Sequence, residues 1–301
     1  MKPLYMILIA LLLAASGTLF AAQQQKPTEQ EELALAAMEG LMAQSSERAL
    51  PIIRKVLNGT QTTLVKKRAL FVLSQIDGPE AEEILIQTSR SADAELRSEA
   101  IRSIGIGGND KSLAALQDIY RTGDADVKEQ VLHAWLIADR KEQVYQAALD
   151  AKSEEEAAEA IHILGAMGAV EELRKLGDRP NSASRKLVNA YAISGDLTSL
   201  RKIAESNAEV SVRAEAVQQI GIIDGDAART ALRDIYMRST DAQIKEAALQ
   251  GLLIADDEKG VLELYRAAKN ADEKRALLRT LTMMDGDAAL EAIDSALEGK
   301  K

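Results

Sequence analysis

The chain has 301 residues, of which 47% are apolar, 28% charged and only 3% aromatic, with a formal net charge of −10 and no cysteine. An acidic chain is repelled by nucleic-acid phosphates and by anionic lipids, which argues against both as partners. The absence of cysteine excludes disulfide bonds and lipid attachment through a thiol, so packing must supply the stability.

Residues 1–22 have the layout of a secretory signal peptide. Lys2 precedes an apolar run from Leu4 to Ala15, small residues follow, and cleavage is predicted near Ala21-Ala22. The alternative is an uncleaved inner-membrane anchor over residues 4–22, because this stretch has no charge and can span a bilayer. The shortness of the apolar run favours cleavage. We therefore expect a periplasmic or secreted protein without membrane insertion, in which residues 23–28 form a polar linker.

From residue 29 onward, one apolar pattern recurs along the chain. An apolar residue is followed four positions later by a small one, then by an adjacent apolar residue and by another three positions on. These steps place the side chains on one stripe of an α-helix. The pattern occurs at Leu33-Ala37-Met38-Leu41, Val65-Ala69-Leu70-Leu73, Leu96-Ala100-Ile101-Ile104, Val127-Val131-Leu132-Trp135, Ala160-Ile161-Leu164, Leu187-Val188-Tyr191, Val212-Ala216-Val217-Ile220, Ile244-Ala248-Leu249-Leu252 and Leu277-Leu278-Leu281.

A second helix is predicted after each of these. Its stripe is clearest at Leu113-Leu116-Ile119-Tyr120 and at Leu290-Ile293-Leu297. From Ala37 to Leu277 there are 240 residues over eight intervals, so the repeat is about 30 residues long, as in helical solenoids. No stretch alternates with period two, and no strand is predicted.

The turns between the helices have a recognisable composition. In Asp77-Gly78-Pro79 and Asp224-Gly225-Asp226 we expect the glycine to end the first helix and the following aspartate, where present, to cap the second. Pro51 and Pro79 are expected in the first turn of a second helix, where proline is tolerated. Thr28 and Glu31 have the spacing of a capping box.

The strongest internal match joins Leu96–Tyr120 to Val212–Tyr236, with 12 identities in 25 positions at a separation of 116 residues. The segments LRSEAIRSIG and VRAEAVQQIG…DAARTALRDIY resemble HEAT repeats, specifically the short HEAT-like repeats of the phycobilisome-lyase type. The resemblance implies an all-α, right-handed α-solenoid of about nine stacked helical pairs over residues 29–301. The interruption at Asp178-Arg179-Pro180-Asn181 predicts a bend near 178–182, flanked by compressed helices at residues 170–176 and 197–205.

Patterns of catalytic or ligand-binding chemistry are not found in the sequence. There is no cysteine, no G-x-S-x-G and no phosphate-binding loop after a strand, and His133 and His162 fall in different repeats. We therefore expect no catalytic, cofactor or metal site. A basic column is either a ladder for an anionic ligand or, as we favour, paired with acidic residues of adjacent repeats; its members are Lys66, Arg97, Lys128, Arg213, Lys245 and Lys274.

Asp118 and Asp234 recur on the face of the second helix opposite its apolar stripe, and Glu263 and Arg266 are similarly placed one repeat later. The resemblance implies that second helices line the concave surface on which partners dock, although duplication alone also explains the recurrence. The resulting hypothesis is an exported, non-enzymatic scaffold that binds a protein or peptide partner. The alternatives are an enzyme or chromophore-handling protein related to HEAT-like lyases, and a purely structural spacer.

Overall fold

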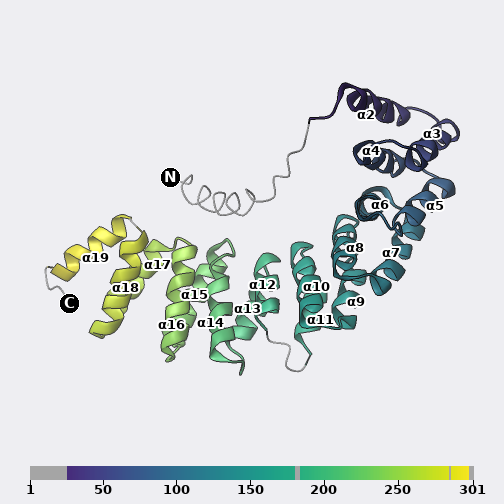
Figure 1. Ribbon diagram of the computed structural model, residues 1–301. Helices are drawn as coiled ribbons and strands as arrows, with labels where there is room; N and C mark the ends of the chain where they lie inside the picture. The colour runs from purple at the N-terminus through teal and green to yellow at the C-terminus, as the bar shows by residue number, and fades with distance from the viewer. Residues whose placement is uncertain (1–25, 180–183, 285, 298–301) are drawn as a thin grey trace. The chain divides into compact units, whose positions relative to one another are not determined.

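The computed structural model describes residues 26–179, 184–284 and 286–297, and within them it contains eighteen α-helices and no strand (Figure 1). The predicted signal peptide lies outside the described residues, as do 23–25 of the linker and 180–182 of the expected bend. The helices follow one another as nine pairs, and every predicted apolar pattern falls on the first helix of a pair.

The first helices are α2 (Glu29–Leu41), α4 (Thr63–Leu73), α6 (Ala94–Gly107), α8 (Ala125–Ile137), α10 (Glu154–Ala166), α12 (Arg185–Ile193), α14 (Val210–Ile220), α16 (Ala242–Ile254) and α18 (Ala271–Met284). The second helices are α3 (Ser46–Asn58), α5 (Pro79–Thr88), α7 (Asp110–Thr122), α9 (Lys141–Asp150), α11 (Val170–Gly177), α13 (Leu197–Ala204), α15 (Asp226–Arg238), α17 (Glu258–Ala267) and α19 (Asp287–Leu297). The short α11 and α13 confirm the compressed helices predicted beside the interruption.

The chain divides into two compact units, one through Ala100 and one from Ile101 onward. In the first unit α2 packs on α4, and α3 packs on α4 and α5. In the second unit each first helix from α8 to α18 packs on the next first helix, while α15 contacts α17 and α17 contacts α19 (Figure 1). Each unit is a stack of helical pairs, which is the arrangement of an all-α solenoid.

The core lies along the predicted stripes. The small position of the pattern is fully buried in most repeats, for example at Ala100, Ala216 and Ala248, which confirms the helix register. The prediction is wrong at the two ends, because Leu33 on α2 and Leu290 and Leu297 on α19 are exposed. These are the first and last described helices, so within this part of the chain no further repeat covers their outer faces.

Several first helices approach each other closely at glycine. A Cβ built on Gly221 of α14 would lie 2.3 Å from the Gly251 carbonyl oxygen of α16, and one on Gly165 of α10 would lie 3.0 Å from the Cα of Ala190 on α12. The same position carries Leu253 in α16. Leu253 lines a cavity between α16 and α18.

The turns differ in part from the prediction. Gly78 and Gly225 have positive φ angles of 133° and 112°, but they are the N-caps of α5 and α15 rather than the ends of the preceding helices. Asp226 is therefore the first helical residue and pairs with Arg229 at 2.9 Å instead of capping. Pro79 begins α5 as predicted, whereas Pro51 lies inside α3, because that helix already starts at Ser46. The capping box of Thr28 and Glu31 is confirmed.

Buried carboxylates join second helices of neighbouring repeats. Asp196, the N-cap of α13, accepts two hydrogen bonds from Arg174 of α11 at 2.8 and 2.7 Å and one from the Ser199 hydroxyl at 2.6 Å. Burial opposes its charge, but the hydrogen bonds from Arg174 and Ser199 outweigh it and lower the pKa of Asp196. Asp257 of the α17 cap is held in the same way by Arg233 of α15 at 2.9 Å.

Candidate functional site

The four residues predicted to bind a partner all lie on second helices. Asp118 on α7 is exposed and pairs with Arg121 at 2.8 Å, and Glu263 on α17 is exposed. Asp234 on α15 is half-buried, 3.9 Å from Arg238. Arg266 on α17 pairs with Glu291 of α19.

The structure does not gather these four residues at one place. Asp118 belongs to a helix four pairs before α15. Asp234 lines a cavity of about 260 Å³ with charged residues of α13 and neighbouring segments, among them Arg201 and Arg213. A partner that contacts all four residues would therefore have to extend over several repeats. That each of these residues binds a partner stays a prediction.

Two of the six residues of the basic column, Lys128 and Lys245, pair with acidic residues of an adjacent repeat as the sequence favoured. Lys128 on α8 pairs with Glu156 in the first turn of α10 at 2.6 Å, and Lys245 on α16 pairs with Glu273 in the first turn of α18. Both pairs join residues 28 positions apart, which is close to one repeat. Arg213 instead donates to the Ala204 carbonyl of the preceding helix at 3.0 Å.

An aromatic ring lies beneath several of these cations. The ammonium of Lys245 stands 4.9 Å from the centre of the Tyr236 ring, and Lys128 and Lys274 have the same relation to Tyr120 and Tyr265 at 5.6 Å. Burial, together with the nearby negative charge of Glu273, raises the pKa of Tyr236. Tyr236 and Tyr265 are buried and Tyr120 is half-buried, so each ring belongs to the core and contacts one cation of the column.

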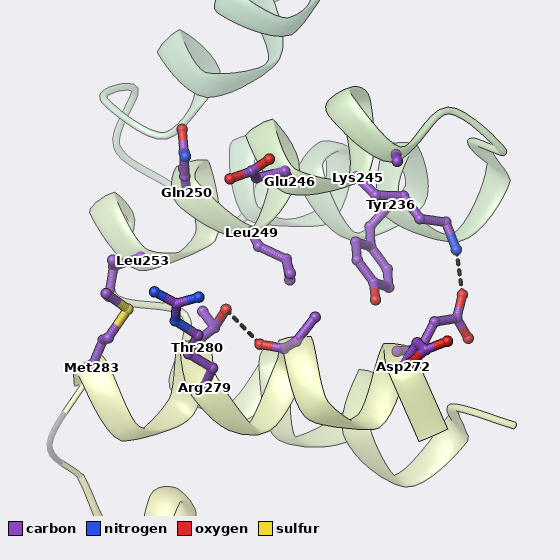
Figure 2. A pocket seen from close by; sticks show the side chains of 13 residues that line it. Tyr236, Lys245, Glu246, Leu249, Gln250, Leu253, Asp272, Arg279, Thr280 and Met283 are labelled. Carbon is purple, nitrogen blue, oxygen red and sulfur yellow. Dashed lines mark hydrogen bonds and ion pairs between the residues drawn. The ribbon is translucent and has the colours of Figure 1, made fainter. Parts of the chain in front are cut away.

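A cavity of about 500 Å³ lies in the second unit, between α16 and α18 (Figure 2). It is lined by Tyr236, Ala242, Lys245, Glu246, Leu249, Gln250, Leu253, Asp272, Glu273, Ala276, Arg279, Thr280 and Met283. This volume lies within the range of ligand pockets.

The cavity has an apolar interior and a charged edge. Figure 2 shows Tyr236 and Leu249 between the two helices, with Leu253 and Met283 side by side at one end and Lys245 at the other. Lys245 forms an ion pair with Glu273. Glu246 and Arg279 also line the cavity and form no ion pair with any residue that the structure describes. Such a surface suits an apolar group that carries polar or charged flanks.

Sequence reasoning missed this cavity. The sequence feature associated with the cavity is Leu253 of α16. In the alignment of the repeats, Leu253 corresponds to Gly221 at the end of α14. A glycine lets neighbouring helices touch, whereas a leucine keeps them apart, but the sequence does not tell which neighbour the position faces.

The two histidines occupy exposed positions on α8 and α10, with His133 3.9 Å from Glu129. Over residues 26–179, 184–284 and 286–297, no group of three or more histidine, aspartate or glutamate side chains is arranged to hold a metal ion. In the same ranges, none of the helices combines the length and the apolar character needed to cross a bilayer.

The stacked helical pairs define an α-solenoid, and the comparisons identify its repeats. Residues 50–135 match the family model of HEAT repeats, which confirms the HEAT-like repeats predicted from the sequence. The comparison with curated proteins finds no match.

The solved structures that resemble the chain are similar at low identity. They include human deoxyhypusine hydroxylase in complex with glycerol (17% identity, 90% of this chain and 93% of that chain, TM-score 0.34). Another is the complex of CpcE and CpcF of phycocyanin lyase from Nostoc (19% identity, 88% and 98%, TM-score 0.34). An engineered protein aligns with 17% identity over 92% of each chain, with a TM-score of 0.32. At these values the fold assignment rests on the helices and on the HEAT match.

Proposed function

We propose that this HEAT-like solenoid is an exported, non-enzymatic scaffold that binds a protein or peptide partner. The observation that carries the proposal is the cavity between α16 and α18, whose apolar interior is bordered by Glu246 and Arg279, two charges without an ion pair in the part of the chain that the structure describes. Repeat proteins present extended surfaces on which one partner contacts several repeats. The cavity would hold one apolar side chain of such a partner.

The chemistry of the cavity favours binding over catalysis. Its lysine, Lys245, is engaged on both sides, by the Glu273 carboxylate and by the Tyr236 ring, so its amino group does not point freely at a bound ligand. An enzyme or chromophore-handling protein is the alternative, and it would require a reactive group in this cavity that modifies its ligand.

Photo-crosslinking tests the proposal in the native cell envelope. A photoreactive amino acid is placed at Gln250 or Met283, at the edge of the cavity, and at Asp118 or Glu263 on the second helices. We expect capture of the same partner from both cavity positions and no capture from the matched exposed position Asn207. Absence of a specific partner from every position would contradict a binding scaffold.

Export is a separate part of the proposal and rests on the sequence of residues 1–22. We expect the mature protein to begin near Gln23 and to fractionate as a soluble protein of the periplasm or medium. Intact-mass measurement on the native protein checks this. A membrane-bound chain that retains residues 1–20 would show that the segment is an anchor.

A further inference from the structure

One position of the first helix is apolar and exposed in almost every repeat of the second unit. It lies six residues after the buried small position, at the carboxyl end of the helix. At the ends of α12, α16 and α18 it is occupied by Ile193, Ile254 and Met283, and just after α14 by Ile222; in chain order, Ile193, Ile222, Ile254 and Met283 are 51%, 55%, 48% and 61% exposed. We call these four residues the isoleucine row. Ile106 and Ile137 occupy the position in α6 and α8, and α10 has Ala166.

The helices that carry the row are neighbours in the stack. Each of its helices packs on the next, from α12 to α18. Its last member, Met283, lies beside Leu253 and lines the cavity between α16 and α18 (Figure 2). Exposed apolar side chains gathered on one surface mark interaction sites, whereas isolated ones need no explanation. Core packing does not account for the row, because half of each side chain is in solvent.

The spacing of the row favours a helical occupant. Packed helices lie about 8–10 Å apart, so the row presents one apolar side chain roughly every 10 Å. An α-helix repeats its face every seven residues, or about 10.5 Å. Side chains on one face of a strand recur about every 6.7 Å and would soon lose register. A polyproline helix repeats at about 9.3 Å, but it is bound by aromatic grooves, and the row contains no aromatic residue.

The charges around the row favour a basic occupant. Asp224 and Asp256 follow Ile222 and Ile254 by two residues, are exposed, and form no ion pair within the described part of the chain. Glu246 and Arg279 offset each other in the cavity lining near Met283, so the excess negative charge lies at Asp224 and Asp256. A second copy of this chain would bring carboxylates against carboxylates, and an anionic lipid surface would be repelled. A helix with lysine or arginine beside its apolar face is complementary.

We propose that the isoleucine row binds an amphipathic α-helix of a partner protein, about 22 residues long, with an apolar residue at every seventh position and basic flanks. This inference rests on the proposed scaffold function and specifies the partner's chemistry. Each apolar residue of the helix lies between row members of adjacent repeats, and the one at the α18 end reaches the cavity beside Met283. The basic flank lies along the turns that carry Asp224 and Asp256.

Photo-crosslinking from the row measures the spacing directly. A photoreactive amino acid replaces Ile193, Ile222 or Ile254 in three separate full-length variants, and the modified residues of the captured partner are mapped by mass spectrometry. We expect the three sites to fall on one helical segment at steps of seven residues. Steps of two or three residues would indicate an extended or polyproline peptide. Cross-links to lipid would indicate a membrane surface. Either result would overturn the proposal.

A binding assay separates this inference from the proposed function. The probe is a synthetic peptide of four heptads with leucine at the repeating position and lysine beside it. We expect the double substitution Ile222→Glu and Ile254→Glu to weaken its binding at least tenfold. The matched control, Met237→Glu and Leu290→Glu, changes two equally exposed apolar residues outside the row and should alter binding less than twofold.

Equal loss in both double variants, or equal binding of a scrambled peptide, would overturn the helix-binding role. Capture of a partner from Asp118 or Glu263 but from no row position would also overturn it, while leaving the scaffold function in place. If no position on either surface captures a partner, the scaffold function fails as well.

Discussion

Gly221 on α14 lies directly against Gly251 on α16, so close that a Cβ on Gly221 would stand 2.3 Å from the Gly251 carbonyl oxygen. Backbone atoms cannot move aside as the end of a side chain can. Contact between the two helices therefore depends on the absence of a side chain at this position.

The first prediction follows from this contact. Gly221→Ala should force α14 and α16 apart and destabilise the second unit by about 1–3 kcal/mol. The control is Gly40→Ala on α2, where a Cβ meets nothing within 4 Å. Because alanine favours the helix, the control should be neutral or stabilise by up to about 1 kcal/mol. Calorimetric melting of both variants checks this, and a stabilised Gly221→Ala would contradict the close approach.

The second prediction tests the helix register at the small position. Ala216 is fully buried on α14, so Ala216→Asp places an unpaired charge in the core and should cost on the order of 3 kcal/mol or more. Ala227 is exposed in the first turn of α15, where a carboxylate is favoured, and Ala227→Asp should be nearly neutral. The melting temperatures should differ by several degrees, and equal values would refute the register.

The third prediction concerns alkaline pH. Burial raises the pKa of Tyr191 to about 12, and its hydroxyl donates to the Leu173 carbonyl at 2.9 Å. An unfolded tyrosine ionises near pH 10. Between about pH 10 and 12 the unfolded chain therefore loses this proton while the folded chain keeps it, and stability is lost as pH rises.

The measurement is the melting temperature at several pH values from 9 to about 11.5 for the wild type and for Tyr191→Phe. The variant should be less stable at neutral pH by about 1 kcal/mol, because a buried hydrogen bond is missing. It should also show a shallower decline at high pH. Parallel declines in the two proteins would mean that Tyr191 does not contribute to the alkaline transition.

The fourth prediction compares the two charged surfaces. Asp118→Lys with Asp234→Lys should leave the melting temperature nearly unchanged, because Asp118 is exposed and Asp234 is only half-buried. If second helices contact the partner, the double variant should weaken its capture and change the salt dependence.

The matched variant is Lys245→Glu with Arg213→Glu. It places a carboxylate beside Glu273 and removes the donor to the Ala204 carbonyl, so it should lower the melting temperature. The experiment is a thermal melt with a pull-down at two salt concentrations for both variants. Normal capture by the aspartate variant, together with a stable basic-column variant that loses the partner, would place binding away from the second helices.

Much of the fold could be predicted from the sequence, because one apolar stripe marks one buried helix face. The nine first helices, the buried Ala100, Ala216 and Ala248, and the short α11 and α13 follow from that rule. Pro51 was expected in the first turn of a helix, but α3 begins five residues earlier, at Ser46. No local sequence feature distinguishes a helix that begins at Pro51 from one that begins at Ser46. Leu33 and Leu290 were predicted in the core because a stripe does not reveal whether a neighbour covers it.

The cavity and the isoleucine row were missed for a related reason. Ile222 and Ile254 look like part of an apolar helix, and only the packing of adjacent repeats shows that they are exposed. Leu253 lines the cavity between α16 and α18, and only the stacking of the repeats shows which helix it faces. The candidate partner residues Asp118 and Glu263, in contrast, are on the surface where the helical periodicity placed them.

The glycine contacts give the second unit a period of two repeats rather than one. Gly105, Gly165 and Gly221 each bring a first helix against the next, while the intervening helices carry Leu136, Ala192 and Leu253 at the same position. The internal duplication has a separation of 116 residues, or four repeats. Because four is even, each duplicated glycine still faces a helix of the same kind. Loss of the α10–α11 repeat alone would set Leu136 of α8 against α12, where Ala190 packs on a glycine, whereas loss of two adjacent repeats would keep the alternation.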